Sequence, residues 1–503
     1  MSRTRVRRWL VGFLALVVAM TTVWVATPGA ASASRRVACA DLAQVRLPEV
    51  SSASAELDTD GEAAGMTGLP EFCRVVLTVV PQIGIEVWLP TGTYNRRFEA
   101  VGGGGYAGAI SYPALANALR SGYATASTDT GHQVRDGSFA LGPDGRLNQQ
   151  LITDFASRSL IELTLTAKTL IRAFYGRPAE FSYWNGCSTG GRQGLMLAQR
   201  LPGAYDGILS GAPAINWDRF IPAELWPQVV MRQELGAPIA ACKLTAATEA
   251  AVARCDRNDG VVDGVLDDPR RCDFDPRSLI GQATPCGAFT AADAGVIQAI
   301  WDGPRTTGGR SLWYGLTPGT PLNALAGPVP FPIAENHIRF WVEQNPQFDW
   351  KTLDYAGFER DFRASQRLFN DVIGTDDPDL SRFRASGGRL LIWHGWADPL
   401  IFPQGSIDYY QRVLDRTHRV GDFARLFLAP GVGHCGGGSG PNTFDMFGTL
   451  VNWVEHRSAP DRIIASTVEN GQVVRTRPLC AYPGAARYDG RGDPNSAASF
   501  DCS

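Results

Sequence analysis

The sequence lacks several features that mark metal-centred, nucleic-acid-binding or membrane proteins. No two cysteines have the C-x-x-C spacing of paired zinc ligands, so a zinc-thiolate site is not indicated. No basic stripe runs through the chain, whose formal charge is −3, and we expect no nucleic-acid partner. Beyond the N-terminal segment, no apolar run is long enough to span a membrane, and internal repeats and low-complexity segments are absent.

The N-terminal segment has the layout of a secretory signal peptide. Arginines at 3, 5, 7 and 8 precede an uncharged apolar run at residues 9–26, and Ala31-Ser32-Ala33 offers a cleavage site. The run also has the length of an uncleaved membrane anchor, which stays the alternative. We predict that residues 1–33 are a cleaved signal peptide, that the protein is secreted, and that the mature chain makes no membrane contact.

Ten cysteines lie outside that segment, at positions 39, 73, 187, 242, 255, 272, 286, 435, 480 and 502. An even number in an exported chain indicates five disulfides. Their number alone does not fix the pairing.

Strand and helix patterns alternate in two parts of the chain. Short β-branched or aromatic runs at residues 75–80, 85–89, 98–101, 123–127 and 181–184 read as strands, and 157–175 has helical spacing. The alternation resumes at 390–394 and continues through 406–414, 425–428 and 444–456. We therefore predict an α/β domain, with a largely parallel sheet, formed by residues 34–212 and 385–503. The aromatic-rich, irregular segment 213–384 between them is expected to be an inserted lid domain.

A serine stands at the junction of a predicted strand and helix. Gly186-x-Ser188-x-Gly190 has the G-x-S-x-G form of a nucleophile elbow, in which the serine adopts a strained turn at a helix N-terminus. A glycine-rich turn without catalytic function is the alternative. The flanking strand and helix favour the nucleophile and with it the α/β-hydrolase fold.

A serine nucleophile needs a base and an acid that orients the base. In this fold the chain order is serine, acid, histidine. Asp398 and His434 each follow a predicted strand by a few residues, in that order. We therefore predict Ser188, Asp398 and His434 as the catalytic triad, with no catalytic cofactor.

The other five histidines are weaker candidates for the base. His132 and His394 precede Asp398 in the chain, and we expect each to be a hydrogen-bonded structural residue. The remaining three lie in the lid or near helix ends: His337, His418 and His456.

Cys187 precedes Ser188 and Cys435 follows His434. If serine and histidine come within hydrogen-bond reach, their neighbours can approach to the roughly 4.4–6.8 Å Cα separation of a disulfide. Two unrelated cysteines are the alternative.

An oxyanion hole requires backbone N–H donors beside the nucleophile. Thr189 follows Ser188, and the Gly102–Gly105 run follows an early strand. We predict donors from Thr189, Gly104 and Gly105.

An acidic loop lies in the predicted lid. Asp256, Asp259 and Asp263 fall within eight residues that also contain two glycines. Carboxylates together with the backbone carbonyls of Val261 and Val265 would suit calcium, although the spacing is not that of an EF-hand. A solvated acidic turn is the alternative.

Three motifs together resemble the tannase and feruloyl esterase family: Gly186-Cys-Ser-Thr-Gly-Gly191, His394-Gly-Trp-Ala-Asp398 and Gly433-His-Cys-Gly436. The similarity extends to Gly102–Gly108, to Ser127–His132, to the acidic loop and to the Cys480–Cys502 tail. The resemblance implies a disulfide between Cys187 and Cys435. It also implies a structural Ca²⁺ bound by Asp256, Asp259, Val261, Asp263 and Val265.

The resemblance further implies the bridges Cys255–Cys272, Cys39–Cys73 and Cys480–Cys502. Family members often carry a small local disulfide after the acidic loop, whereas this chain has only Cys286 there, which leaves Cys242 as its partner.

The function that the resemblance implies is hydrolysis of esters of aromatic acids through an acyl-enzyme. We expect hydroxycinnamoyl (feruloyl-type) esters, either small molecules or linked to polysaccharide. Gallate esters, as in a tannase, or other aryl esters are the alternative. A secreted serine peptidase of this fold and a non-catalytic, calcium-dependent carbohydrate-binding protein are the other classes considered.

Overall fold

The structure, a computed structural model, describes residues 36–503. The predicted signal peptide lies outside the described residues. Within residues 36–503, no helix combines the length and the apolar character needed to cross a membrane.

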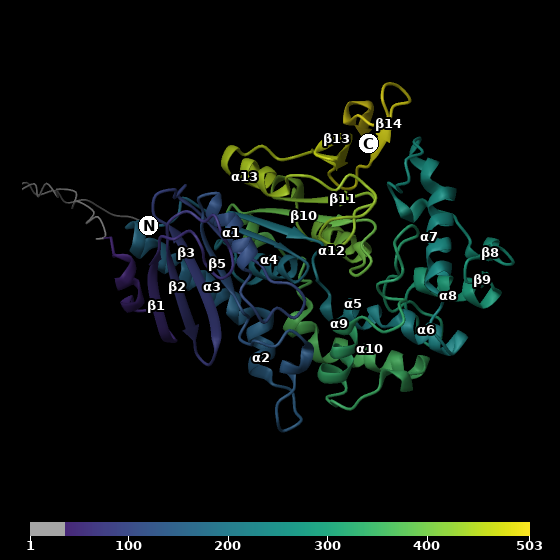
Figure 1. Cartoon of the computed structure of the whole chain (residues 1–503), viewed down its shortest axis with the longest axis horizontal. Helices are drawn as coiled ribbons and strands as arrows, with labels where there is room; N and C mark the ends of the chain where they lie inside the picture. The colour runs from purple at the N-terminus through teal and green to yellow at the C-terminus, as the bar shows by residue number, and fades with distance from the viewer. Residues whose placement is uncertain (1–35) are drawn as a thin grey trace, which may run out of the picture.

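A nine-stranded sheet forms the centre of the molecule (Figure 1). Its strand order is β1-β2-β3-β5-β4-β6-β7-β10-β11. The pairs from β1 to β5 are antiparallel, and those from β5 through β4 to β11 are parallel. The strands are β1 (Val50–Asp58), β2 (Phe72–Val79), β3 (Ile83–Pro90), β4 (Arg97–Val101), β5 (Ala124–Thr128), β6 (Phe181–Cys187), β7 (Gly207–Gly211), β10 (Arg389–Gly395) and β11 (Ala424–Ala429).

Alternating side chains of the central strands enter two hydrophobic cores. Leu390 and Ile392 of β10 lie in one core, and Leu391 and Trp393 lie in the other, because successive side chains of a strand point to opposite faces. The helices α3 (Ser159–Tyr175), α4 (Thr189–Arg200) and α12 (Pro403–Arg416) supply residues to the first core. On the opposite face pack α1 (Tyr112–Arg120) and α13 (Met446–His456). Helices therefore cover both faces, as in an α/β-hydrolase fold.

The segment between β7 and β10 adds no strand to this sheet. Its elements are α5 (Trp217–Glu224), α6 (Trp226–Leu235), α7 (Ala241–Cys255), β8 (Ala283–Thr284), β9 (Gly287–Ala288), α8 (Ala291–Asp302), α9 (Pro332–Asn336), α10 (Tyr355–Phe369) and α11 (Ser381–Ala385). In Figure 1 its helices from α5 to α10 lie beside and below the sheet. Most of its buried side chains form a third core, which also takes Tyr106, Phe139 and Phe155 from segments outside the insertion. Near its end, Leu380 and Phe383 already pack in the core of the sheet.

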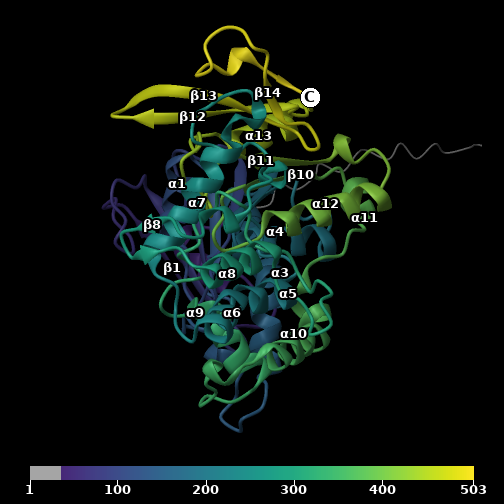
Figure 2. The same cartoon turned by 90° about the vertical axis from the view of Figure 1, so that its right-hand side faces the viewer.

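Two small hairpins follow the last helix: β12 (Arg462–Glu469) with β13 (Gln472–Cys480), and β14 (Ala486–Tyr488) with β15 (Phe500–Cys502). Figure 2 shows β12 and β13 extending beyond the sheet. Side chains of β13 reach the acidic loop of the insertion, where Arg475 donates a 3.2 Å hydrogen bond to the carbonyl of Asp263. The C-terminal part of the chain therefore contacts the insertion directly.

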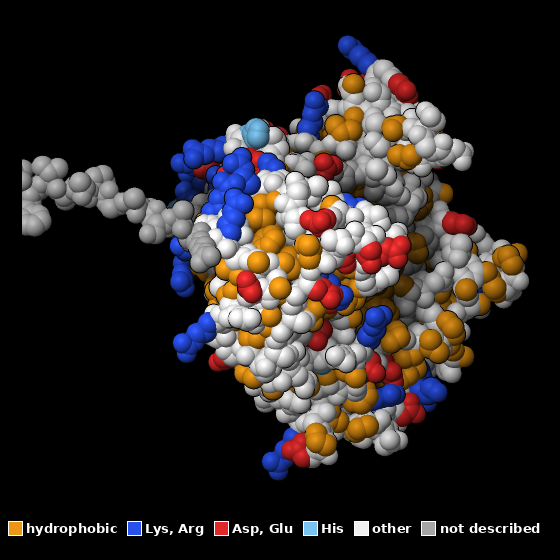
Figure 3. Space-filling model, turned by 60° about the vertical axis from the view of Figure 1, so that its left-hand side comes forward, with side chains coloured by type: hydrophobic (Ala, Val, Ile, Leu, Met, Phe, Trp, Pro, Cys, Tyr) orange, Lys and Arg blue, Asp and Glu red, His pale blue; other side chains and the backbone are white. Residues whose placement is uncertain are grey.

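Charged side chains of both signs are dispersed over the face in Figure 3, interrupted by small hydrophobic patches. Lys and Arg are most frequent there near the start of the described chain.

Candidate active site

Ser188 lies at the sharp turn between β6 and α4, with φ 61° and ψ −125°. The glycines around it allow this turn. A Cβ on Gly186 would lie 2.5 Å from the backbone of Gly190, and one on Gly190 would lie 3.1 Å from Gly102 Cα. A side chain at Gly186 would therefore force the elbow apart. The turn places Ser188 directly before the first residue of α4, where the positive end of the helix dipole stabilises negative charge.

The loop after β4 lies against this elbow. Gln193 of α4 accepts a 3.0 Å hydrogen bond from the N–H of Gly103, and the Thr189 hydroxyl donates a 2.6 Å bond to the carbonyl of Gly105. Gly104, Gly105 and Thr189 line the same cavity as Ser188. The structure therefore brings together all three residues predicted as oxyanion donors. Gln193, which holds the loop, was not predicted.

His434 and Asp398 form a hydrogen-bonded pair, with Nδ1 2.8 Å from Oδ2. Nδ1 donates to the carboxylate, which leaves Nε2 as the free base of the neutral ring. His434 and Ser188 line one cavity, and Asp398 is buried beside it. The three predicted triad residues thus meet at the ends of strands β6, β10 and β11, although no hydrogen bond joins Ser188 to His434 in this structure.

Asp398 is held by donors on both of its oxygens. Oδ1 accepts from the N–H groups of Leu400 and Ile401, at 2.9 and 3.0 Å. Oδ2 accepts from His434 and also lies 3.1 Å from Nε2 of His394. Burial acts to raise the pKa of Asp398, but the hydrogen bonds from the two histidines outweigh it and hold that pKa below its usual range. Asp398 is therefore an anion across the neutral range.

His394 is fully buried, and its neighbours fix its tautomer. Nε2 faces two acceptors, the carboxylate of Asp398 and the carbonyl of Ile401 at 3.0 Å, so it carries the proton. Nδ1 then accepts from the hydroxyl of Ser406 at 2.8 Å. The prediction of a hydrogen-bonded histidine agrees with this environment, but its contact with Asp398 was not foreseen. The only feature of the sequence that pointed to this contact was the short separation of the two residues in His394-Gly-Trp-Ala-Asp398.

The predicted disulfide between Cys187 and Cys435 is present, with Cα atoms 5.9 Å apart. Since its cysteines adjoin Ser188 and His434, it ties the β6–α4 elbow to the loop after β11. The other four bridges also match the expected pairs: Cys39–Cys73, Cys242–Cys286, Cys255–Cys272 and Cys480–Cys502.

The cavity beside Ser188 has a volume of about 380 Å³. The insertion supplies most of its apolar wall, from α5 and from the segment around α9. These apolar side chains are Trp217, Phe220, Ile221, Phe331 and Ile333. One acid, Glu224 at the end of α5, also lines it, and no sequence motif had marked this residue.

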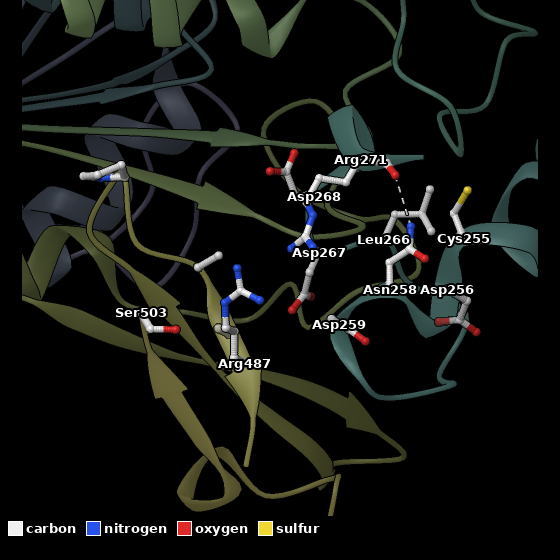
Figure 4. Close-up of a pocket in the computed structure, with 13 residues that line it drawn as sticks. Cys255, Asp256, Asn258, Asp259, Leu266, Asp267, Asp268, Arg271, Arg487 and Ser503 are labelled. Carbon is white, nitrogen blue, oxygen red and sulfur yellow. Dashed lines mark hydrogen bonds between the residues drawn. The ribbon is translucent and has the colours of Figure 1, made fainter. Parts of the chain in front are cut away.

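The acidic loop lies at a different cavity, between the insertion and the C-terminal strands (Figure 4). Asp256 accepts hydrogen bonds from the N–H groups of Asp263 and Gly264, at 3.1 and 2.9 Å. The carboxylate of Asp263 pairs with Arg477. Asp259 Oδ1 also accepts from the N–H of Val261, at 2.9 Å, so protein groups engage all three predicted acidic ligands.

The third, Asp259, lines this cavity together with Asp267 (Figure 4). The Oδ2 atoms of both are buried and have no hydrogen-bond partner among residues 36–503. Such carboxylate oxygens suit a hard cation chemically. Over the same residues, however, no three His, Cys, Asp or Glu side chains are grouped as a metal site, so the calcium site stays a prediction. Asp267 is not among the predicted ligands because it lies two residues beyond Val265, outside the acidic motif.

The arrangement around Ser188 can carry out acyl transfer. Ser188 and His434, with its free Nε2, line one apolar cavity, and the Asp398 carboxylate holds the histidine. Thr189, Gly104 and Gly105 line the same cavity.

Comparison with known proteins agrees with this chemistry. A family model described as tannase and feruloyl esterase matches residues 66–503. A probable feruloyl esterase of Arthroderma benhamiae is 40% identical over 86% of each chain. A mono(2-hydroxyethyl) terephthalate hydrolase of Piscinibacter sakaiensis is 33% identical over 88% of this chain and 87% of its own.

Among solved structures, feruloyl esterase B from Aspergillus oryzae superimposes with a TM-score of 0.81 at 27% identity, covering 92% of this chain and 98% of that one. The chain belongs to the tannase and feruloyl esterase family and is a carboxylic ester hydrolase of the α/β-hydrolase fold.

Proposed function

We propose that the protein is a secreted esterase that releases hydroxycinnamic acids from small-molecule or polysaccharide-linked esters, with Ser188, His434 and Asp398 as its triad. The observation that carries this proposal is the cavity beside Ser188 and His434, which is walled by aromatic and aliphatic side chains. A flat aryl group gains about 0.5–1.5 kcal/mol per well-placed aromatic contact beyond its area burial. The name feruloyl esterase, carried by similar proteins, supports the hydroxycinnamoyl assignment.

The reaction follows from the site geometry. Ser188 Oγ attacks the ester carbonyl carbon while His434 Nε2 takes its proton, and the carbonyl oxygen becomes an oxyanion. N–H groups of Thr189 and of the Gly104–Gly105 loop stabilise that charge. When the tetrahedral intermediate collapses, His434 protonates the departing alkoxide, and the alcohol leaves.

Water then attacks the acyl-Ser188 ester, with His434 again taking the proton. Collapse of the second intermediate releases the acid and returns the proton to Ser188. Asp398 stays ionised and stabilises the imidazolium in both halves of the reaction.

The alternative is a tannase or another aryl esterase of the family, as the similar terephthalate monoester hydrolase illustrates. A gallate carbonyl is attached directly to its ring, whereas the cinnamoyl spacer moves the ring away from Ser188. One cavity depth does not serve both acids equally.

The test is a side-by-side measurement of kcat/KM on methyl ferulate, methyl gallate and 4-nitrophenyl butyrate. We expect methyl ferulate to be hydrolysed with a higher kcat/KM than methyl gallate, its closest competitor. Gallate leading by about tenfold, or about 1.4 kcal/mol in transition-state binding, would make the protein a tannase. Turnover of the butyrate alone would overturn the aromatic-acid assignment.

Secretion is supported by the five disulfides, which persist in oxidising compartments. N-terminal sequencing of the exported protein should give a chain that begins near residue 34. A start at Met1 in a membrane fraction would favour the anchor.

We also propose that the acidic loop binds one structural calcium ion. The unpaired Oδ2 atoms of Asp259 and Asp267 support it. Asp256 and Asp263, with the carbonyls of Val261 and Val265, would complete the ligands. The ion would supply positive charge that stabilises the contact between insertion and C-terminal strands, and the triad chemistry does not require it.

A further inference from the structure

Glu224 is the acidic side chain of the insertion that reaches the cavity of Ser188. It ends α5, is 1% exposed, and lines the cavity together with Ser188 and His434. Its Oε2 atom has no hydrogen-bond partner anywhere in residues 36–503. A buried polar atom that the fold leaves unpaired destabilises the protein, so a partner from a bound ligand would relieve this penalty.

The charges around Glu224 favour its neutral form. Burial raises the pKa of Glu224 well above its usual value, and the negative charge of nearby Asp398 raises it further. No Lys or Arg is among the described residues that line the cavity, and the cation that could form there is protonated His434. A neutral carboxyl group has an O–H donor and a carbonyl acceptor, so it can bond in both directions.

A phenolic hydroxyl is the matching partner, because it can both donate and accept a hydrogen bond and is carried by a flat apolar ring. We propose that Glu224 is a specificity residue that hydrogen-bonds a ring hydroxyl of the aromatic acyl group while Ser188 attacks the ester. This proposal rests on the aryl-ester function above and adds the group on the ring that the cavity recognises.

The same environment disfavours a ring that carries a carboxylate. An anion buried in this cavity would meet no cationic side chain from Lys or Arg and would lie near Asp398, so its desolvation would not be compensated. Acyl groups with a neutral hydroxyl are therefore expected to be preferred over those with a second carboxylate.

The test compares three methyl esters that differ at one ring position: 4-hydroxycinnamate, unsubstituted cinnamate and 4-carboxycinnamate. In the wild-type enzyme, kcat/KM for the hydroxy ester should exceed that for the unsubstituted ester by about tenfold, which corresponds to one buried hydrogen bond. The 4-carboxy ester should be the poorest of the three.

Glu224→Leu should bring the ratio of hydroxy to unsubstituted ester close to one. The loss should come from the hydroxy ester, because the plain ring has no group to bond. Glu224→Gln, which keeps a donor and an acceptor, should retain most of the preference. Glu224→Met is the second apolar variant if leucine does not fold there, since its flexible side chain has a similar length.

Asp218→Asn is the matched control. Asp218 lies on the same helix and is fully buried, but it does not line the cavity. Its replacement should leave the ratio unchanged even if stability changes. If Glu224 had only a structural role, its replacement would lower kcat/KM for the hydroxy and the unsubstituted ester equally, and their ratio would not change.

A wild-type ratio near one, an apolar variant at position 224 that keeps the full preference, or efficient turnover of the 4-carboxy ester would each overturn the proposal. Failure of the proposed function would give a different result, because neither the hydroxy nor the unsubstituted cinnamate would then be hydrolysed.

Discussion

Cys187 and Cys435 are joined across 248 residues of sequence, and each is the immediate neighbour of a proposed catalytic residue. The bridge fixes the elbow that carries Ser188 against the loop that carries His434. Positioning of a nucleophile and its base within hydrogen-bond reach is a large part of covalent catalysis, so this disulfide is expected to act on both stability and rate.

Replacement of both cysteines by alanine should therefore lower the free energy of unfolding by about 2–5 kcal/mol. It should also lower kcat, and by a larger factor than the change in KM. Denaturant unfolding and steady-state kinetics measure these two effects. The control is the double alanine variant at Cys242 and Cys286, a bridge within the insertion, which should lose stability with little change in kcat. Equal kinetics in the two double variants would contradict a positioning role.

Asp398→Asn should reduce kcat by about three to four orders of magnitude, because an amide neither fixes the His434 tautomer nor stabilises the imidazolium. The 2.8 Å contact with Nδ1 is the basis for this expectation. Kinetics on methyl ferulate provide the measurement, and circular dichroism controls for folding. Full activity of the variant would mean that another carboxylate orients the base.

His394→Leu should lower kcat by about tenfold, the order of one lost hydrogen bond to a charged group, and leave KM nearly unchanged. His394 donates to Oδ2 of Asp398, and its loss would raise the pKa of Asp398 and loosen the carboxylate. Denaturant unfolding and steady-state kinetics separate the two effects of this replacement. A change in stability alone, with an unchanged kcat, would assign His394 to packing.

Glu224→Gln should gain stability relative to the wild type as pH rises. The unfolded chain loses the Glu224 proton near its ordinary pKa of 4.5, whereas the folded protein keeps it to higher pH because burial and Asp398 raise the folded value. Stability from this group is therefore complete below pH 4.5 and is lost as pH rises through the folded pKa. The stability difference between variant and wild type should therefore grow from about pH 4 to pH 8. A pH-independent difference would place the folded pKa near 4.5.

Removal of calcium should lower the melting temperature and change kcat only indirectly, because the acidic loop lies at a cavity other than that of Ser188. Thermal unfolding with a strong chelator, and then with calcium restored, is the measurement. Asp259→Asn should remove the calcium dependence. An unchanged melting temperature under chelation would mean that the loop is an acidic turn closed by Arg477 and backbone N–H groups.

The sequence predicted the main α/β elements because their patterns are local. The strand at 98–101, the helix at 157–175 and the Ser188 elbow each follow from a few consecutive residues and match β4, α3 and the β6–α4 turn. β1 was not predicted because its Ser- and Ala-rich sequence forms a largely exposed edge strand without strong alternation. The sequence also did not predict that the pairs among β1, β2, β3 and β5 are antiparallel.

In the site, the sequence indicated which residues lie together where a motif marks them, as with the hydrogen-bonded pair of Asp398 and His434. The sequence did not predict three residues, because their roles arise from packing between segments far apart in the chain: Glu224, Gln193 and Asp267. In the sequence, Glu224 is an ordinary helical glutamate. It is buried because the insertion packs beside Ser188, and no local sequence pattern indicates that burial.

The most direct measurement is mass spectrometry of the enzyme quenched during turnover of 4-nitrophenyl ferulate, followed by peptide mapping. A feruloyl adduct is expected on the peptide that contains Ser188, and it should be absent from the turnover-deficient Ser188→Ala variant. Ester hydrolysis at the wild-type rate by Ser188→Ala, or an adduct on another residue, would contradict the assignment of Ser188 as the nucleophile.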